Sequence, residues 1–268
     1  MPSRVLLIRP GGVGDCVLCL PAMERLRSQY TEVWTAPRNV PLIRFADHVD
    51  SIPRTGLDLL GIPGVTPPAG LVDRLRGFDR IVSWYGSNRP EFRKAVAELP
   101  FEFFPALPPQ DSSTHAADFF LAQAGLEGPA TPRIECRVEK SDFAVIHPFS
   151  GSARKNWPLE RFREVAAELQ KRMPLRWCAG PEEPLPDAVR FEDLWELARW
   201  LASACLYIGN DSGISHLAAA VGTPVAAVFV STDPRVWAPR GRVRIAPPDV
   251  TVPDILTLVN SLLCEDRV

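Results

Sequence analysis

The alternation of apolar and polar positions predicts that short buried strands alternate with helices along the chain. The pattern begins with a strand at 4–9, a glycine-containing turn at 10–14 and a helix from about 15 to 29. Further strands are expected at 32–35, 80–84 and 101–104, and helices at 40–47, 71–76, 90–99 and 114–124. Alternation of this kind is typical of a mostly parallel sheet covered by helices.

A second series of the same kind follows a segment at 127–141 that is rich in proline, glycine and charge. The expected elements are a strand at 143–147, a polar loop at 148–157, a helix at 158–172, a strand at 175–179, a helix at 191–203, a strand at 206–209, a helix at 214–221, a strand at 225–230 and a helix at 253–263. We therefore predict two α/β lobes, 1–140 and 141–268. The last helix belongs to the second lobe in sequence, but it could pack against the N-terminal lobe.

Composition agrees with a globular protein and narrows its partners. Of the 268 residues, 46% are hydrophobic and 23% are charged, which argues against long disorder. The formal net charge of −2 gives no broad attraction to nucleic acid or to an anionic membrane. We expect no nucleic-acid partner, and an anionic ligand would have to be bound by local groups.

The six cysteines lie within apolar segments and the chain opens without the apolar stretch of a signal peptide, which favours the cytoplasm. The chain contains no run of about 18 apolar residues, so we expect no transmembrane helix. Cys16 and Cys19 form a single C-x-x-C pair in an apolar helix and are expected to pack there. Because the chain has only four histidines, no multi-histidine metal site is expected.

Three loops combine a strand end with a helix start, where free backbone amides and the helix dipole favour phosphate. They are 11–15, 150–157 and 209–215. The first has neither the G-x-G-x-x-G spacing of a dinucleotide site nor the Gly-Lys-Ser/Thr of a Walker A loop. The amides of Gly12 and Gly14 are nevertheless candidate donor-binding groups.

Asp15 ends the first loop, where its carboxylate would compete with phosphate for the same amides. A carboxylate in such a place is suited to accept a proton. The alternative is that Asp15 caps the helix start.

In the second loop, Ser150 and Ser152 offer hydroxyl and amide donors, while Arg154 and Lys155 add positive charge that suits a diphosphate. The alternative is a solvated basic turn.

In the third loop, Asp211 is a candidate helix cap, and Ser212 and Gly213 would allow the backbone to approach phosphate. His216 would project from the first helical turn, although a histidine on so apolar a helix could equally be a satisfied core residue. Glu182 and Glu183 follow another strand, where a carboxylate can accept ribose hydroxyls; a solvated turn is the alternative.

Taken in order, these segments resemble glycosyltransferase family 9, the ADP-heptose:lipopolysaccharide heptosyltransferases and their relatives. Three blocks carry the resemblance: Val5 to Asp15 with Leu20-Pro21-Ala22; His147 to Ser152 with Lys155-Asn156-Trp157-Pro158; and Gly209 to Ala220 with Gly222-Thr223-Pro224 and Thr232-Asp233-Pro234.

The resemblance implies a GT-B fold, in which two Rossmann-like lobes with mostly parallel sheets face each other across a cleft. It also implies inverting, metal-independent transfer of a sugar, with no cofactor. Asp15 would be the general base, and Lys155 with Ser150 or Ser152 would bind the diphosphate. Asp211, Ser212, Gly213 and His216 would line the donor site, and Glu182 or Glu183 would contact the ribose.

The expected donor is ADP-heptose and the expected acceptor is lipopolysaccharide or a related surface glycan, with at most peripheral contact at the inner membrane face. Compared with that family, the connection from Gly180 to Phe191 looks shortened, which leaves the donor base open. The alternatives are a sugar-nucleotide epimerase or hydrolase on the same fold, or a non-catalytic sugar-nucleotide-binding module.

Overall fold

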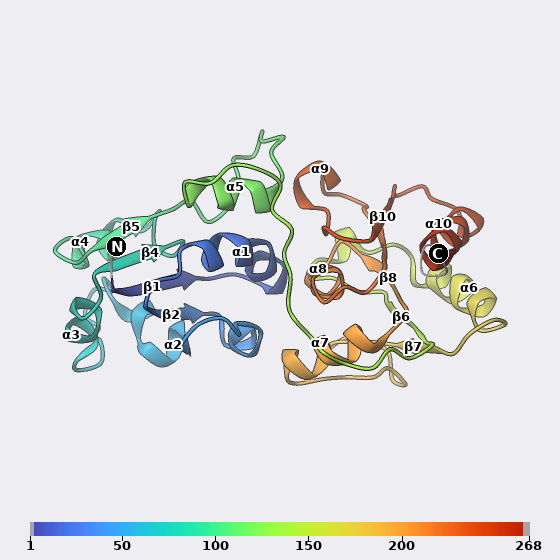
Figure 1. Cartoon of the computed structure of the whole chain (residues 1–268), viewed down its shortest axis with the longest axis horizontal. Helices are drawn as coiled ribbons and strands as arrows, with labels where there is room; N and C mark the ends of the chain where they lie inside the picture. The colour runs from blue at the N-terminus through green and yellow to red at the C-terminus, as the bar shows by residue number, and fades with distance from the viewer. Residues whose placement is uncertain (1–2, 265–268) are drawn as a thin grey trace. The chain divides into compact units, whose positions relative to one another are not determined.

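The computed structural model describes residues 3–264, which form two α/β units (Figure 1). The first unit comprises residues 3–112 and 116–130, and the second comprises 113–115 and 131–264. The division falls after Ala130 and not near residue 140. The reason is that Ile134 is buried and its N–H donates to the carbonyl of Ala220 in the second unit at 2.9 Å.

The sheet of the first unit has five parallel strands in the order β3-β2-β1-β4-β5, which is the Rossmann order. Its strands are β1 (Arg4–Arg9), β2 (Tyr30–Thr35), β3 (His48–Ser51), β4 (Arg80–Ser83) and β5 (Phe101–Phe103). The strand order changes direction between β1 and β4. The turn that follows β1 is therefore at the point where such sheets bind ligands.

Helices surround this sheet because its central strands are apolar on both faces. They are α1 (Val13–Arg25), α2 (Ile52–Thr55), α3 (Leu71–Arg76), α4 (Pro90–Ala95) and α5 (Ala116–Gln123), with 3-10 turns η1 (Pro37–Leu42) and η2 (Leu57–Leu59). Leu6 and Ile8 of β1 pack with Leu75 of α3 and Phe92 of α4. Outside that cluster, α1 and α5 lie side by side (Figure 1).

The helix predicted at 40–47 is wrong. A 3-10 turn ends at Leu42, and the edge strand β3 begins at His48. Pro37 and Pro41 lack the N–H groups that a regular α-helix needs, so the segment closes only a short 3-10 turn. Leu42 and Ile43 are buried in this segment although it forms no helical face.

The second sheet also has five parallel strands, in the order β10-β9-β8-β6-β7. Its strands are β6 (Ala144–His147), β7 (Leu175–Trp177), β8 (Leu206–Asn210), β9 (Val225–Val228) and β10 (Val243–Ala246). This is the flavodoxin-like order, with its switch point between β6 and β8. The predicted α/β class with two parallel sheets is confirmed, although β10 was not predicted.

The last helix belongs to the core of the second unit. The helical elements of this unit are η3 (Ala153–Lys155), α6 (Leu159–Leu169), α7 (Leu194–Ser203), α8 (Gly213–Ala220), α9 (Pro234–Trp237) and α10 (Val252–Cys264). Ile255, Val259 and Leu262 of α10 are buried with residues of α6 and of the sheet, and α6 and α10 lie side by side (Figure 1). The last helix, whose packing the sequence did not determine, thus packs within the second unit.

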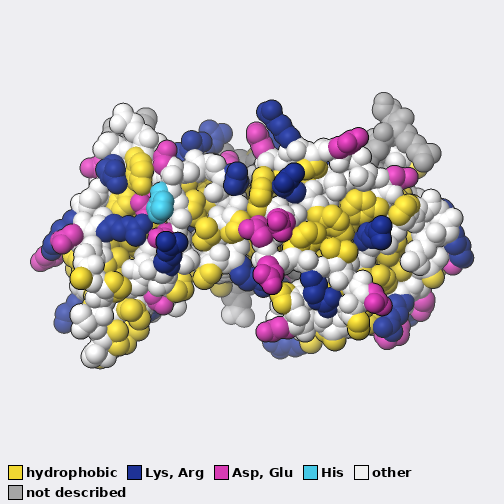
Figure 2. Space-filling model, turned by 90° about the horizontal axis from the view of Figure 1, so that it is seen from below, with side chains coloured by type: hydrophobic (Ala, Val, Ile, Leu, Met, Phe, Trp, Pro, Cys, Tyr) yellow, Lys and Arg dark blue, Asp and Glu magenta, His cyan; other side chains and the backbone are white. Residues whose placement is uncertain are grey.

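The surface seen in Figure 2 carries acidic and basic side chains interspersed with apolar ones, without a field of one sign. This agrees with the small net charge of the chain. Across residues 3–264, no helix combines the length and apolar character needed to cross a bilayer.

Candidate functional site

Two loops of the second unit meet because β6 and β8 are neighbours in the sheet. His147, the last residue of β6, is in register with Gly209 of β8, so the segments that follow both strands leave the same edge side by side. Gly209 allows this close approach, since a Cβ there would lie 2.7 Å from Tyr207 Oη and 2.9 Å from the His147 carbonyl oxygen. The edge coincides with the switch point of the sheet.

Asn210 connects the two loops. Its side chain is fully buried; Nδ2 donates to the carbonyl of Pro148 at 2.8 Å, and Oδ1 accepts from the N–H of Trp157 at 2.9 Å. One amide side chain thus holds both ends of the loop at 148–157. Sequence reasoning did not single it out, because an asparagine after a strand usually signals a turn.

Lys155 and Asp211, which the sequence analysis placed in separate loops, form an ion pair. Lys155 Nζ lies 2.7 Å from Asp211 Oδ2. The carboxylate side chain is 4% exposed and the lysine side chain is 34% exposed, so the cation reaches solvent from a buried counter-ion. Thr232 adds a third group, since its Oγ1 donates to the same Oδ2 at 2.5 Å. In the sequence, Thr232 was singled out only as part of the third block of the resemblance.

Ser212, and not Asp211, caps helix α8. The Ser212 hydroxyl accepts from the N–H of Ser215 at 3.3 Å, and the Ser215 hydroxyl donates to the carbonyl of Asn210 at 2.5 Å. The predicted capping role of Asp211 is therefore corrected. Because the cap is supplied by the next residue, the carboxylate of Asp211 is available to Lys155 and Thr232.

His216 lies one helical turn into α8 with its side chain 5% exposed. Its Nε2 is 4.0 Å from Asp211 Oδ1. Burial lowers the pKa of this imidazole to about 4; Asp211 opposes the shift, whereas His115 and Lys155 add to it. At neutral pH the ring is thus an uncharged hydrogen-bonding group beside the ion pair.

Two serines predicted to bind phosphate lie in the loop that carries Lys155. Ser150 Oγ is 2.8 Å from the Ser152 carbonyl oxygen and 2.7 Å from Asn156 Oδ1, and its single proton serves one of them at a time. The Ser152 carbonyl accepts from the N–H of Lys155 at 2.9 Å, which closes the 3-10 turn. The serines therefore shape the loop, and their contacts with a donor stay a prediction.

Glu183 is held at the end of the neighbouring strand β7. Its Oε2 accepts from the Gly180 N–H at 2.6 Å and lies 3.0 Å from His147 Nε2. Burial alone would raise the pKa of Glu183, but the hydrogen bonds from His147 and Gly180 outweigh it, so that the net pKa is lowered. Glu183 is therefore an ionised carboxylate at the same sheet edge as the ion pair.

In the first unit, Asp15 reaches back over the turn that follows β1. Its Oδ2 accepts from the Gly12 N–H at 2.9 Å, as in a capping box, and its side chain is 32% exposed. Gly11 has φ +104°, and a Cβ there would lie 2.7 Å from this carboxylate. Asp15 thus makes the capping contact that the sequence offered as the alternative to catalysis. It occupies the Gly12 amide, so roles for Gly12 and Gly14 in donor binding stay predictions.

Arg9 is a buried cation beneath this turn that sequence reasoning missed. Its side chain is 1% exposed; Nε and Nη2 donate to the Asp15 carbonyl, and Nη1 donates to the Ala106 carbonyl. The guanidinium carbon lies 4.4 Å from the Phe120 ring centroid, and Nη2 lies 3.9 Å from Asp15 Oδ1. The available signal was an arginine that follows four apolar residues at the end of a strand.

Cys16 and Cys19 are packed inside the first unit, as predicted. Both thiols are buried, and burial raises the pKa of each to about 12, so neither is a thiolate at neutral pH. Among residues 3–264, no group of three or more His, Cys, Asp or Glu side chains is arranged to hold a metal ion. Metal independence of the chemistry stays a prediction.

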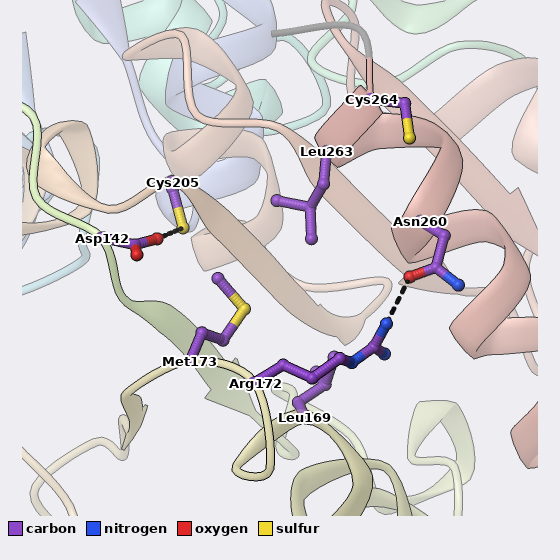
Figure 3. Close-up of a pocket in the computed structure, with 8 residues that line it drawn as sticks. All are labelled: Asp142, Leu169, Arg172, Met173, Cys205, Asn260, Leu263 and Cys264. Carbon is purple, nitrogen blue, oxygen red and sulfur yellow. Dashed lines mark hydrogen bonds between the residues drawn. The ribbon is translucent and has the colours of Figure 1, made fainter. Parts of the chain in front are cut away.

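A pocket of about 410 Å³ lies elsewhere in the second unit, near the amino ends of β6, β7 and β8 (Figure 3). Figure 3 shows a hydrogen bond in it from Arg172 to Asn260 at 3.0 Å. Its lining residues are Asp142, Leu169, Arg172, Met173, Cys205, Asn260, Leu263 and Cys264. None of the predicted site residues lines this pocket. The convergence of charged groups places the candidate site at the opposite edge of the sheet.

Comparison with known proteins identifies the family. The sequence profile of "Glycosyltransferase family 9 (heptosyltransferase)" matches residues 92–246, more than half of the chain. The chain belongs to glycosyltransferase family 9. The matched region contains Lys155, Glu183, Asp211 and His216, whereas Asp15 precedes it.

Curated relatives are similar over part of their length. Lipopolysaccharide heptosyltransferase 3 of Escherichia coli K12 is 30% identical over 117 residues, covering 37% of this chain and 34% of the relative. Lipopolysaccharide heptosyltransferase 1 of Salmonella typhimurium is 26% identical over 207 residues, covering 68% and 64%. The chain thus spans between a third and two thirds of these relatives.

Solved structures share the fold over nearly the whole chain. A family 9 glycosyl transferase from Veillonella parvula matches with a TM-score of 0.77 at 15% identity, covering 98% of this chain and 97% of that one. The E. coli ADP-heptose lps heptosyltransferase II matches with a TM-score of 0.75 at 15% identity, covering 99% and 100%. The two Rossmann-like units therefore form a GT-B fold, as expected.

Proposed function

We propose that this protein is an inverting, metal-independent glycosyltransferase that moves heptose from ADP-heptose to lipopolysaccharide or a related surface glycan. The observation that carries the proposal is the partly exposed Lys155 side chain paired with buried Asp211 at the switch point of the second sheet. Family membership and relatives named as lipopolysaccharide heptosyltransferases support the choice of sugar and acceptor.

The donor diphosphate would bind at the second sheet edge. Lys155 supplies a positive charge on a side chain that already reaches solvent, and Ser212 and Gly213 open helix α8, whose dipole favours an anion. Neutral His216 can donate or accept a hydrogen bond without adding charge. As the bond between the anomeric carbon and the diphosphate oxygen breaks, Lys155 would stabilise the negative charge on the leaving nucleoside diphosphate.

Asp15 would act as the general base. Its carboxylate would take the proton of the acceptor hydroxyl, whose oxygen attacks the anomeric carbon from the side opposite the leaving diphosphate, so the configuration inverts. The Gly12 N–H holds one oxygen, Oδ2, and the side chain is about one-third exposed. Capping and catalysis are therefore compatible, because the cap orients the carboxylate and the second oxygen can serve as the base.

We place this reaction in the cytoplasm, with at most peripheral contact with the inner membrane face. Cysteines 16, 19, 136, 178, 205 and 264 are all free thiols, which accords with a reducing compartment. The proposal includes no cofactor and no nucleic-acid partner.

A donor panel tests the function. The protein is incubated with ADP-heptose and with ADP-, UDP-, GDP- and dTDP-sugars, with and without cell-envelope glycan acceptors and with EDTA, and nucleotide release is followed. We expect acceptor-dependent release of ADP that EDTA does not abolish. Release without acceptor would instead indicate a hydrolase. Binding without release would indicate a non-catalytic module, and no binding of any sugar nucleotide would refute the proposal altogether.

A matched pair of lysine variants tests whether donor binding depends on the ion pair of Lys155 and Asp211. Lys155→Ala removes the cation of the ion pair, whereas Lys171→Ala removes a lysine of the same unit that pairs with Glu168 on the surface. Only the first should weaken donor binding. Equal effects of both variants would mean that the site lies elsewhere.

A further inference from the structure

The segment between β7 and α7 is a compact loop with a closed neck. Cys178 and Val189 form a parallel bridge, and the Val189 N–H donates to the Trp177 carbonyl at 2.8 Å. The Ala179 N–H donates in turn to the Val189 carbonyl at 3.2 Å. The chain therefore leaves and rejoins the edge of the sheet at one point, with Glu183 on the loop between.

Arg190, which follows Val189 of the neck, donates hydrogen bonds from its guanidinium to backbone carbonyls of this loop. Its Nη2 donates to the carbonyls of Glu183 at 2.8 Å and Leu185 at 2.9 Å. Nε donates to the Gly180 carbonyl at 3.1 Å, and Nη1 to the Ala188 carbonyl at 3.1 Å. A single guanidinium thus ties together four carbonyls of a loop that has no regular structure of its own. The hydrogen bonds of Arg190 thus fix the backbone of the loop between β7 and α7.

His147 fixes the direction of the Glu183 carboxylate. A carboxylate can only accept, so His147 Nε2–H is the donor in the 3.0 Å contact with Oε2, and the Gly180 N–H donates to the same oxygen at 2.6 Å. Among the described residues, nothing donates to the other oxygen, Oε1. The glutamate side chain is 26% exposed, so it retains contact with solvent.

The other ring nitrogen of His147 indicates why the histidine is there. Its Nδ1 is buried without a hydrogen-bond partner among the described residues, and the residue is 3% exposed. Burying a polar atom unpaired is costly, so a histidine kept for packing alone would be an unfavourable choice. Its one side-chain hydrogen bond goes to Glu183. The ring's position is thus explained by that carboxylate.

We propose that His147 is a positioning residue that holds Glu183 so that Oε1 can accept the ribose hydroxyls of the donor. This inference rests on the proposed function and on the ribose contact that the family resemblance implies for Glu183; what it adds is the role of His147. His147 is the last residue of β6, and Glu183 follows β7, the parallel strand paired with β6. Lys155 lies in the loop that follows β6, at the same carboxyl edge of the sheet. A carboxylate at the end of a neighbouring strand is where nucleotide-binding α/β folds bind ribose.

The test measures discrimination for the ribose hydroxyls. Binding of ADP, 2′-deoxy-ADP and 3′-deoxy-ADP, with UDP and its 2′-deoxy form as a second pair, is measured by calorimetry on the full chain. We expect the wild type to prefer at least one ribonucleotide by about tenfold, the size of one hydrogen bond to a charged group. In Glu183→Ala this preference should fall to near onefold, while affinity for the deoxynucleotide stays within about twofold.

His147 variants separate positioning from a purely structural role. His147→Phe keeps a ring but cannot donate, and it should lose the preference as Glu183→Ala does. His147→Gln restores an N–H of similar reach and should recover most of the preference. The double variant His147→Phe with Glu183→Ala should add nothing to Glu183→Ala. If His147→Phe does not fold, His147→Met serves as the variant that cannot donate.

Three outcomes would overturn the inference. Equal weakening of ribonucleotide and deoxynucleotide binding in the His147 variants would mean that the ring only supports the fold. Binding of ADP or UDP by the wild type with no preference over the deoxy forms would refute ribose contact by Glu183, while leaving the proposed function intact. Failure of every nucleotide to bind the wild type would remove the proposed function and this inference together.

Discussion

The turns after β1 and β8 both bring an aspartate to the start of a helix at the switch point of a parallel sheet, yet the two carboxylates make different contacts. Asp15 lies three positions after the cap residue Gly12 and binds its N–H. Asp211 lies one position before the cap residue Ser212 and binds Lys155. Only the first position lets a side chain reach back to the cap amide. The register of the aspartate against the helix start therefore decides its contact.

The cations of the two sites differ in the same way. Arg9 is buried beneath the first turn and uses its donors on backbone carbonyls, so the charged group that reaches solvent there is the Asp15 carboxylate. In the second unit the buried member is Asp211 and the exposed member is Lys155. One site therefore turns a carboxylate toward solvent and the other an ammonium group, although each combines an aspartate with a basic side chain.

The largest effect should come from Asp15→Asn. The amide oxygen can still accept from the Gly12 N–H, so the fold should be retained, but the group no longer takes up a proton. We expect acceptor-dependent turnover to fall by about 10²- to 10⁴-fold with donor affinity unchanged. Release assays and calorimetry check this. Turnover within a few-fold of the wild type would leave Asp15 as a helix cap only.

Acid should destabilise the second unit through His216. Its folded-state pKa is about 4, against 6.5 as the ordinary value. Below pH 6.5 the unfolded chain binds a proton at this histidine that the folded chain does not bind. The contribution of neutral His216 to the unfolding free energy is therefore fully present above pH 6.5. It decreases by on the order of 3 kcal/mol as the pH falls toward 4.

Urea unfolding at pH 7 and pH 4.5 measures this effect. His216→Gln should show a smaller drop in unfolding free energy between the two pH values than the wild type. His48→Gln, at a half-exposed histidine of the first unit, is the control for loss of an imidazole. An identical drop in the wild type and His216→Gln would show that other groups carry the acid sensitivity.

Lys155→Ala should weaken binding of the nucleoside diphosphate by about 10- to 100-fold, because it removes a charged donor and leaves the buried Asp211 carboxylate facing the phosphates. Lys155→Arg should retain most of the affinity. Isothermal calorimetry with ADP checks both variants. If Lys155→Ala bound ADP as tightly as the wild type, the contrast between the two sites would lose its basis.

The smallest effect expected is from Ser212→Ala, which removes the cap of α8 but not the ion pair. We expect a loss of about 1 kcal/mol in unfolding free energy, the usual contribution of a serine cap. Denaturant titration gives the value, and ADP affinity is the second readout. A loss of affinity as large as that of Lys155→Ala would indicate that the Ser212 hydroxyl itself binds phosphate.

Much of the fold follows from local pattern, but two edge strands do not. The central strands β1, β6 and β8 were predicted because they are continuous apolar runs, as expected for strands buried on both faces. In contrast, β3 reads HVDS and β10 reads VRIA, and in each only one residue of the four is buried. Such strands are recognisable only through pairing with a neighbour that the local sequence does not specify.

The sequence by itself determined the α/β class, the three loops at helix starts and the chemistry of their side chains, since each depends on residues close together in the chain. The tertiary structure decided which groups meet. Lys155 and Asp211 are far apart in sequence and become an ion pair because β6 and β8 are adjacent, with the Asn210 amide holding the loop in place. His147 and Glu183 meet for the same reason across β6 and β7. Strand order is set by the packing of the whole sheet, and so the partners of these charged groups could not be predicted from either segment alone.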